Sequence, residues 1–525
     1  MSTARTLPVW RALDAYAGHF QPPSPQRVDL LVVGAGIAGL VTAVSLLREG
    51  RRVVVVDRQG LGAGETLRTT AHLASALDDR FHHLARLHGR DGARLAAASH
   101  ATAIDWIEAF LGADAQASGF RRIPGYLFAH DGDPAELRRE LEAATGAGLD
   151  VRYLEQGLPA LQTLGPILQF DHQARVDIDA LLARLMDAAL GLGGRFVLGE
   201  VAAVEGGAAP VATLRGGEAI YASAIVLASN VPFHERVPIH TKQAPYRTYV
   251  VAGEVGSAAI PDALIWDNLE AYHYVRLVED RERPGTQLVM VGGEDHRTGQ
   301  DRDPTAFVRL QAWTRARFPG VGEFRYGWSG QVLEPSDGLA FIGPDPGGED
   351  NVYVITGDSG NGITHGTLGG LLVTDLVQGR GNPWAALYDP RRRARDAGEW
   401  LHENANVGAQ YGDWLRGGEV ADASELAPGQ GAILRRGIHR IAVYRNGDGD
   451  LRAFSARCTH MGCAVRWSPQ EKSWDCPCHG SRFDVQTGAV LNGPAHEPLA
   501  PVALDEVPGA DAGAQRQVSV PAPHA

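Results

Sequence analysis

Cysteine is scarce in this sequence, and its placement is uneven. The chain has four cysteines in 525 residues, and all of them lie between Cys458 and Cys478. A disulfide framework would distribute its cysteines along the chain, so this clustering excludes such a scaffold. It indicates dedicated chemistry in one short segment.

Uninterrupted apolar runs and basic runs are also missing. The most apolar stretch, residues 30–47, is broken by Gly34, Gly36, Gly39, Thr42 and Ser45, which argues against a membrane span. A formal net charge of −13 without a basic stripe argues against a nucleic-acid partner. The first residues lack the basic and apolar regions of a signal peptide, so we expect a cytoplasmic location.

Strand and helix patterns alternate along most of the chain. A Val-rich strand near residue 30 leads into a Gly-rich turn and a helix, and the segment VVVVD at residues 53–57 supplies a second strand. This alternation continues to about residue 379 and predicts a doubly wound α/β sheet. From about Arg416 the chain is rich in Gly, Pro and acidic residues. Short strand-like runs with turn signals follow and predict a linker and a small all-β domain.

The cysteine-containing segment combines thiol and imidazole side chains in two loops. Cys458-x-His460 is followed by Cys476-x-x-His479, with the strand-like SWD at residues 473–475 between them. Two thiolates and two imidazoles suit an asymmetric [2Fe–2S] cluster, in which the thiolates hold one iron and the imidazoles hold the other. The same ligands also suit a tetrahedral zinc ion. Zinc sites usually separate paired ligands by two or more residues, whereas Cys458 and His460 have one between them.

This segment, together with the turn at residues 493–495, resembles the Rieske proteins. The resemblance implies a [2Fe–2S] cluster on those four ligands, and a disulfide between Cys463 and Cys478 as in the electron-transferring members. Ser481 matches the hydroxyl that donates a hydrogen bond to a cluster sulfur, whereas Phe483 stands where those members usually carry a tyrosine. Because a lost hydrogen bond destabilises the reduced cluster, we expect a lower reduction potential than in the quinol-oxidising complexes.

A G-x-G-x-x-G motif after the first strand indicates a dinucleotide site. Gly34, Gly36 and Gly39 open the following helix, so backbone amides there would approach a pyrophosphate at the helix N-terminus. Asp57, at the end of the second strand, would accept hydrogen bonds from the ribose hydroxyls of adenosine. The motif by itself leaves FAD and NAD open.

Segments along the whole chain resemble the glycine/D-amino-acid oxidase (DAO) family, in the branch with a C-terminal Rieske domain. Residues 62–75 resemble the stretch that lines the flavin, and residues 351–370 resemble the closing flavin motif. The resemblance implies FAD and a fold, namely a Rossmann-like α/β FAD-binding domain, an interleaved α+β substrate domain and an all-β Rieske domain. The implied FAD contacts are Gly34, Ala35, Gly36, Ile37, Ala38, Gly39, Asp57, Arg58, Thr66, Thr69, Thr70, Val201, Gly357, Asp358, Gly360, Gly362 and Ile363.

The resemblance also divides the chain. We expect a lead-in at residues 1–27, a DAO-like oxidoreductase at 28–415, a linker at 416–428 and a Rieske domain at 429–525. FAD-binding segments are expected at about 28–80, 165–235 and 335–380, and substrate-domain segments at about 81–164 and 236–334.

We expect non-covalent FAD, because Arg68 stands where some relatives carry a flavinylated histidine.

Tyrosine and arginine side chains mark the expected substrate side. Tyr272, Tyr274 and Arg276, together with Arg247, lie in strand-like segments that roof the flavin in DAO-like folds. An Arg and a Tyr there could hold a carboxylate, and ordinary cross-strand contacts explain them equally well. No catalytic base is named, because hydride transfer from a carbon bearing a neutral amine needs orientation more than a proton acceptor.

The expected function is an FAD-dependent oxidoreductase that dehydrogenates a small amine or amino acid and relays electrons through the cluster. Its expected partners are that substrate and a one-electron carrier, either a protein or a quinone-like molecule. Two alternatives stay open: an electron-transfer component that takes electrons through the cluster for a partner enzyme, and a redox sensor without turnover. Asp79, His83 and His88 come near the spacing of a mononuclear iron site, but we expect a solvated helical face there.

Overall fold

A computed structural model describes residues 8–11, 13–129, 134–158, 165–234, 239–256, 260–269, 272–507 and 509. The chain forms two compact units that interleave along the sequence. The larger unit contains Met1–Asn230, Arg247–Asp295 and Phe307–Asp396, and the smaller contains Val231–Tyr246, His296–Ala306 and Ala397–Ala525. The smaller unit therefore includes, besides the expected Rieske domain, stretches that the sequence assigns to the oxidoreductase.

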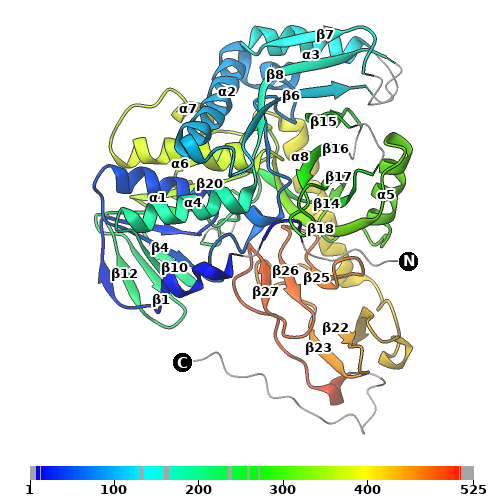
Figure 1. Ribbon diagram of the computed structural model, residues 1–525. Helices are drawn as coiled ribbons and strands as arrows, with labels where there is room; N and C mark the ends of the chain where they lie inside the picture. The colour runs from blue at the N-terminus through cyan, green and yellow to red at the C-terminus, as the bar shows by residue number, and fades with distance from the viewer. Residues whose placement is uncertain are drawn as a thin grey trace. The chain divides into compact units, whose positions relative to one another are not determined.

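A mostly parallel sheet of seven strands lies at the centre of the larger unit (Figure 1). Its strand order is β1-β9-β4-β3-β13-β20-β19, and β19 runs antiparallel to its neighbour β20. Every residue of β3 and β13 is buried, as expected for central strands of a parallel sheet covered on both faces. The strands are β1 (Phe20–Gln21), β3 (Leu30–Val33), β4 (Val53–Asp57), β9 (Arg195–Leu198), β13 (Ala224–Leu227), β19 (Phe341–Pro344) and β20 (Val352–Thr356).

Helix α1 (Ile37–Arg48) packs on β3 and β4, between α4 (Ile178–Gly191) and α6 (Gly362–Val377), as Figure 1 shows. Glycines on α6 allow the close approach of α1. A Cβ at Gly370 would lie 2.8 Å from the backbone nitrogen of Thr42, and one at Gly366 would lie 2.8 Å from the Ile37 side chain. This packing brings the first turns of α1 and α6 together.

Two further sheets complete the larger unit. One has four strands in the order β10-β11-β12-β2, and the other has nine, in the order β18-β14-β17-β16-β15-β6-β8-β5 with β7 paired to β8. Their strands are β2 (Gln26–Arg27), β10 (Val201–Glu205), β11 (Val211–Leu214), β12 (Ala219–Tyr221), β5 (His72–Leu73), β6 (Arg121–Phe128), β7 (Val151–Leu154), β8 (Ile167–Arg175), β14 (Gln243–Glu254), β15 (Leu264–Asp267), β16 (Tyr274–Glu279), β17 (Gln287–Arg297) and β18 (Phe324–Pro335). The remaining helices here are η1 (Asp14–His19), η2 (Glu65–Arg68), α2 (Phe81–Leu111), η3 (Gly112–Asp114), α3 (Pro134–Gly146), α5 (Ala306–Arg317) and α7 (Ala385–Tyr388).

The expected lead-in is part of this architecture. Strands β1 and β2 pair with β9 and β12, and the side chains of Val9 and Trp10 are buried. The Trp10 indole nitrogen donates a hydrogen bond to the Thr69 carbonyl at 2.7 Å. Residues before the first Rossmann strand therefore contribute to the core of the larger unit.

The smaller unit contains two antiparallel sheets. One is formed by β21 (Gly431–Arg436), β22 (His439–Arg445) and β23 (Leu451–Ser455), and the other by β24 (Arg466–Ser468), β25 (Ser473–Asp475), β26 (Arg482–Asp484) and β27 (Val490–Asn492). Its helices are α8 (Ala397–Gln410), η5 (Tyr411–Leu415), η6 (Ala423–Glu425) and η7 (Leu504–Glu506). The two ligand loops precede β24 and connect β25 to β26, so the second sheet holds them side by side.

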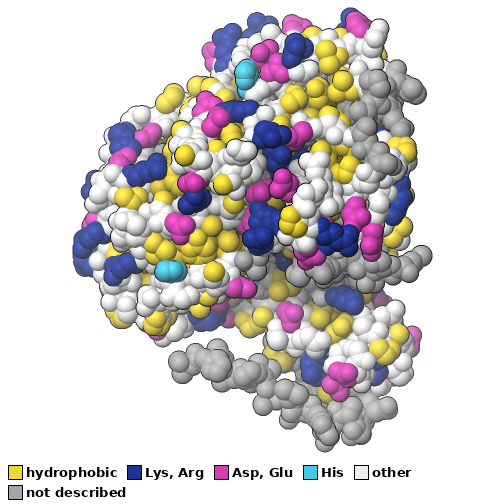
Figure 2. Space-filling view, in the orientation of Figure 1, with side chains coloured by type: hydrophobic (Ala, Val, Ile, Leu, Met, Phe, Trp, Pro, Cys, Tyr) yellow, Lys and Arg dark blue, Asp and Glu magenta, His cyan; other side chains and the backbone are white. Residues whose placement is uncertain are grey.

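The surface carries both signs of charge. On the face that Figure 2 shows, acidic and basic side chains are interspersed over the larger unit. Among the described residues, no helix has both the length and the apolar character needed to cross a membrane.

Candidate functional site

The loop between β3 and α1 has the backbone of a dinucleotide cradle. Gly34 has a φ of +113°, and a Cβ there would lie 2.4 Å from the carbonyl oxygen of Ala228. A Cβ at Gly39 would lie 1.9 Å from the carbonyl oxygen of Gly34, so a larger residue would push the helix away from the loop. No side chain caps α1 at Gly36, and the Thr66 hydroxyl accepts only the first helical amide, at 3.2 Å. The helix N-terminus is therefore suited to bind an anion.

Asp57 lies at the carboxyl end of β4, beside this loop. Its Oδ2 accepts the amide of Ala35 at 2.8 Å, and its Oδ1 accepts the amides of Gln59 and Gly60 at 2.8 and 2.9 Å. Carboxylate oxygens have several acceptor positions each, so these bonds orient the group and leave capacity for further donors. The arrangement fits the expected contact with adenosine ribose hydroxyls.

The closing flavin motif supplies a second cradle. Helix α6 begins at Gly362, and Asn361 makes no side-chain cap there. Gly360 has a positive φ, and a Cβ at this position would lie 2.2 Å from Oδ2 of Asp78. Asp358 accepts an amide hydrogen bond from β18 at 3.1 Å, and burial raises the pKa of its carboxyl to about 6. Two uncapped helix N-termini and two glycine turns lie close together, which fits FAD.

Other expected FAD contacts surround these cradles. Thr69 and Thr70 direct their hydroxyls to neighbouring groups of their own turn. Val201 begins β10 in the four-stranded sheet, and the Arg58 side chain is exposed just beyond β4. Contact of these residues with FAD stays a prediction, as it does for Ala35, Ile37, Ala38, Gly357 and Ile363.

The two arginines named on the substrate side are engaged within the protein. Arg276 is fully buried and donates to three backbone carbonyls at 2.6, 3.1 and 3.2 Å, and its guanidinium lies 5.6 Å from the centroid of the Trp10 ring. Two nitrogens of Arg247 donate to the Ser329 hydroxyl at 3.0 and 2.8 Å. These hydrogen bonds support the fold, and a carboxylate contact by either arginine stays a prediction.

Tyr272 and Tyr274 belong instead to a buried polar cluster. The Tyr272 hydroxyl donates to Asp78 at 2.9 Å, and the Tyr274 hydroxyl lies 2.8 Å from that of Thr248. Thr248 also hydrogen-bonds to Asp295, whose Oδ1 is buried with no hydrogen-bond partner among the described residues. Burial raises the pKa of Asp295 to about 7 and raises that of Asp78 as well. No local motif marked these carboxyls, because separate segments bring them together.

The expected cluster ligands converge in the smaller unit. Cys458 and Cys476 are buried thiols that hydrogen-bond to each other, and the rings of His460 and His479 lie 4.9 Å apart between centroids. Nδ1 of His479 is buried and makes no hydrogen bond within the described part of the chain. Burial lowers the pKa of His479 to about 4, which keeps the imidazole neutral. Two thiols and two neighbouring imidazoles fit a [2Fe–2S] cluster with mixed ligands.

Hydrogen-bond donors surround Cys458. The hydrogen bond between the two thiols lowers the pKa of Cys458 to about 7 and raises the pKa of Cys476. The Ser481 hydroxyl also bonds to Cys458, and its oxygen accepts the amide of Ala495 at 3.0 Å. Phe483 is fully buried and offers no donor. The sulfur environment therefore contains the expected serine hydroxyl and lacks the tyrosine hydroxyl.

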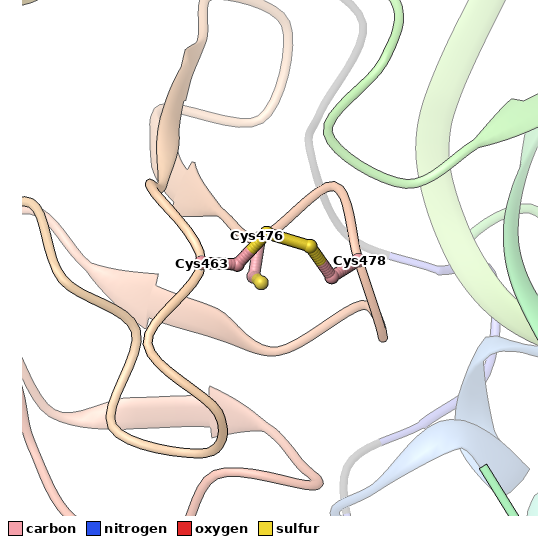
Figure 3. A group of neighbouring side chains, drawn as sticks. All are labelled: Cys463, Cys476 and Cys478. Carbon is pink, nitrogen blue, oxygen red and sulfur yellow. A yellow bond between two sulfur atoms is a disulfide. The ribbon is translucent and has the colours of Figure 1, made fainter. Parts of the chain in front are cut away.

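Cys463 and Cys478 form a disulfide, as the resemblance to electron-transferring Rieske proteins implies (Figure 3). The bond joins the two ligand loops. The sulfur atoms of Cys463, Cys476 and Cys478 lie within 4.8 Å of one another. Because two of these sulfurs are bonded to each other, this group is not a three-thiolate metal site, and Cys476 stays a predicted cluster ligand.

Asp79, His83 and His88 do not converge on one point. Asp79 accepts a hydrogen bond from Ser359 at 2.6 Å, and Nε2 of His88 lies 2.7 Å from a backbone carbonyl. His83 lies 3.8 Å from Asp396. The expected solvated face is wrong for His88, which is buried.

Comparison with known proteins matches both parts of the chain to families. The sequence model of a family described as FAD dependent oxidoreductase (DAO) matches residues 29–376, and that of the Rieske [2Fe-2S] domain matches residues 418–505. A Bacillus subtilis (strain 168) protein described as a Rieske 2Fe-2S iron-sulfur protein, YhfW, is 28% identical over 484 residues, 91% of this chain and 94% of that protein. The cytochrome b6-f complex iron-sulfur subunit of Chlorobaculum thiosulfatiphilum is 39% identical over 80 residues, 15% of this chain and 43% of that protein.

Solved structures share the fold of the larger part. Glycine oxidase from Geobacillus kaustophilus has a TM-score of 0.57 at 19% identity, covering 70% of this chain and 99% of that chain. L-amino acid deaminase from Proteus vulgaris has a TM-score of 0.55 at 16% identity, covering 71% and 99%. At these identities the likeness shows the fold.

Proposed function

We propose, since the chain belongs to the DAO family of FAD-dependent oxidoreductases and carries a Rieske [2Fe-2S] domain, that it dehydrogenates a small amine or amino acid and passes the electrons on through its cluster. The observation that supports this function is that a single chain combines a dinucleotide cradle, a buried polar cluster beside it and a ligand set that fits a [2Fe–2S] centre. Bound FAD supplies two-electron oxidation, and the [2Fe–2S] centre transfers one electron at a time.

The polar cluster around Tyr272 favours a cationic substrate group. An ammonium group there would meet the carboxyls of Asp78 and Asp295, whereas both nearby arginines already have intramolecular hydrogen bonds. Opposite charges attract strongly in a buried site. An amine therefore fits this cluster better than a lone carboxylate does.

Asp295 can accept the proton that an ammonium substrate must lose before hydride leaves the adjacent carbon. Burial raises the pKa of its carboxyl to about 7, so the carboxylate and the acid are both populated near neutral pH. The hydroxyls of Tyr272 and Tyr274 would then orient the neutral amine. Neither role requires an arginine.

Anaerobic stopped-flow mixing with a panel of amines and amino acids tests the proposal. At least one compound is expected to bleach the flavin absorbance, and the EPR signal of the reduced cluster should follow. A Cys476→Ser protein, which lacks a cluster ligand, should bleach without that signal. Bleaching by NADH in place of any amine would contradict the proposal, because the flavin would then take its electrons from a nicotinamide.

A further inference from the structure

Three stretches outside the matched Rieske range fold with the Rieske domain as one unit. They are Val231–Tyr246, His296–Ala306 and residues 397–417. The first two lie inside the range that the DAO model matches. The Rieske domain of this protein is thus covered by parts of the chain that a Rieske domain alone does not contain.

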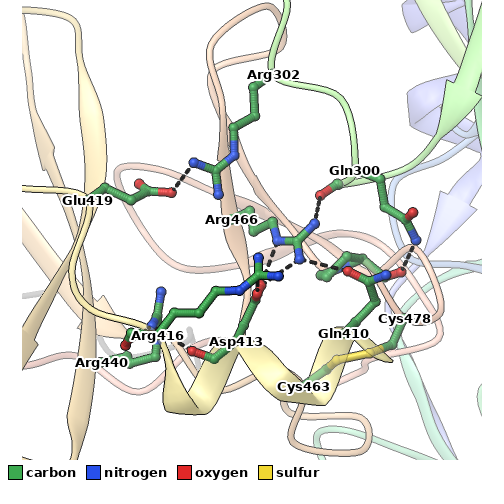
Figure 4. Close-up of polar contacts among 12 residues, drawn as sticks. Gln300, Arg302, Gln410, Asp413, Arg416, Glu419, Arg440, Cys463, Arg466 and Cys478 are labelled. Carbon is green, nitrogen blue, oxygen red and sulfur yellow. Dashed lines mark hydrogen bonds and ion pairs between the residues drawn. A yellow bond between two sulfur atoms is a disulfide. The ribbon is translucent and has the colours of Figure 1, made fainter. Parts of the chain in front are cut away.

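Polar contacts fix the second and third stretches to β24 and to the second ligand loop (Figure 4). The Arg466 guanidinium, from β24, donates to Asp413 and Gln410 at 2.7 Å each and to the Gly299 carbonyl at 3.2 Å. Gln300 donates to a carbonyl of the second ligand loop at 3.0 Å. Both side chains of the Arg466–Asp413 pair are largely buried. Such buried, multiply bonded contacts hold the covering stretches in one position.

His240, in the first stretch, packs against both imidazole ligands. Its ring centroid lies 5.1 Å from that of His460 and 6.0 Å from that of His479, with interplanar angles of 71° and 65°. These values describe edge-to-face ring contacts. His240 is 5% exposed and His479 is 8% exposed, whereas His460 is partly exposed. A ring from the DAO range of the chain therefore packs on the imidazole edge of the ligand set and covers part of it.

The space beside His240 is also nearly filled. A small polar cavity there has room for about one water molecule, and its lining includes His240, Arg297, Gln300, Glu403, Asn406 and Cys478. An ion pair between Arg297 and Glu403 crosses from the second stretch to the third. Asn404 of the third stretch also donates a hydrogen bond to the Thr241 carbonyl at 2.9 Å, so described residues of all three stretches are linked beside the ligand loops.

We propose that His240 closes the imidazole edge of the cluster, so that a one-electron carrier in solution does not reach the cluster through His460 and His479. Imidazole ligands offer a short route to the iron they hold, and a bulky carrier must contact their outer edge to use it. The covering stretch follows β13 of the FAD-binding sheet after three residues, Ala228–Asn230. The protein itself thus supplies the shield, and the edge is reserved for exchange within the chain.

The test uses the full-length protein with both cofactors, reduced chemically with dithionite and mixed with ferricytochrome c. One electron leaves the reduced cluster and converts ferric haem to ferrous haem, with no other reactant. Freeze-quenched samples follow the cluster itself by EPR. We expect the cluster of His240→Ala to be oxidised at least about tenfold faster than that of wild type. His240→Phe keeps a ring in place and should remain as slow as wild type.

Two further measurements make the result specific. His402→Ala removes an exposed histidine from α8 in the same unit and should leave the oxidation rate and the EPR g-values unchanged. His240→Ala should shift the g-values, because a ring no longer packs on the ligands. If His240→Ala does not assemble the cluster, His240→Asn shortens the side chain more mildly and gives the same comparison.

An oxidation rate of His240→Ala or His240→Asn equal to that of wild type would overturn the proposal. Chemical reduction bypasses the organic substrate. A failure of the proposed amine oxidation would therefore leave this test and its interpretation unaffected.

Discussion

Single residues set the properties of the cluster site. Phe483 pairs with Trp474 across β26 and β25 and is fully buried, while Ser481, two residues earlier, bonds to Cys458. The identities of both residues were read from the sequence, because the spacing of a ligand loop is local. The placement of His240 was not, because nothing near it in the sequence indicates which loops it will meet.

Phe483→Tyr is predicted to raise the reduction potential of the cluster. A hydroxyl that donates to a ligand sulfur stabilises the more negative reduced state, and a net gain of about 1–2 kcal/mol corresponds to roughly 40–90 mV for one electron. Ser481→Ala removes the existing donor and should lower the potential by a similar amount. EPR-monitored potentiometric titration measures both. Equal potentials in all three proteins would contradict the role given to these hydroxyls.

Asp295→Asn is predicted to change the pH dependence of flavin reduction. Burial raises the pKa of Asp295 to about 7, above its usual range. The acid is therefore favoured below that pH, and the proton-accepting carboxylate forms as the pH rises through it. The rate of flavin reduction by an amine should rise across this pH range in wild type, and this rise should be absent in Asp295→Asn. Tyr272→Phe, which changes the orientation of the bound amine, should lower the rate but keep its rise with pH.

At the scale of elements, the sequence predicted those features that depend on interactions within a few residues. The strand at Val53–Asp57, the glycine turn and helix α1 follow from apolar runs and backbone requirements within a few residues. The contact of α6 with α1 was not predicted, because it depends on Gly366 and Gly370 meeting a helix from the other end of the chain. The lead-in strands β1 and β2 were missed because a strand of two residues is too short to show an alternation of apolar and polar residues.

Gly39→Ala is predicted to displace α1 from the loop and to remove FAD. The added methyl would lie 1.9 Å from a backbone oxygen, so the helix must shift, at a cost of about 1–3 kcal/mol in stability. Gly191→Ala, at the end of α4, meets nothing within 4 Å and should be neutral or slightly stabilising. Flavin content after gel filtration and thermal unfolding distinguish the two variants. Full FAD retention by Gly39→Ala would contradict the cradle.

Asp413→Ala is predicted to destabilise the cover over the ligand loops. It leaves the buried Arg466 guanidinium without its carboxylate, which costs about 3 kcal/mol or more. Arg416 is a second partner of the Asp413 carboxylate, and the Arg416 side chain is 71% exposed. Arg416→Ala should therefore lower the free energy of unfolding by about 1 kcal/mol or less. The temperature at which the visible absorbance of the cluster disappears reports both. Equal losses would show that the burial of the pair is unimportant.

At the scale of the whole molecule, the two units share one interleaved chain. The cofactors were predictable, because each depends on a compact motif with few alternatives. The composition of the units was not, because the return of Val231–Tyr246 and His296–Ala306 to the Rieske domain depends on tertiary contacts such as Arg466 with Gly299. The domain boundaries drawn from the sequence stay predictions.

The interleaving of the two units places a residue of the DAO range beside the cluster ligands. A Rieske domain attached by a simple linker would present its imidazole edge to solvent, whereas here the His240 ring packs on that edge within the smaller unit. We therefore expect a bulky carrier to reach this edge less easily than it would in a Rieske domain without the stretch.

The most direct test is rapid-freeze EPR of the full-length protein, mixed without oxygen with an amine that bleaches its flavin. If the flavin passes its electrons to the cluster, the reduced-cluster signal appears within the first turnover and is absent from Cys476→Ser, whose flavin still bleaches. A bleached flavin beside a cluster that stays oxidised would contradict electron transfer between the two cofactors.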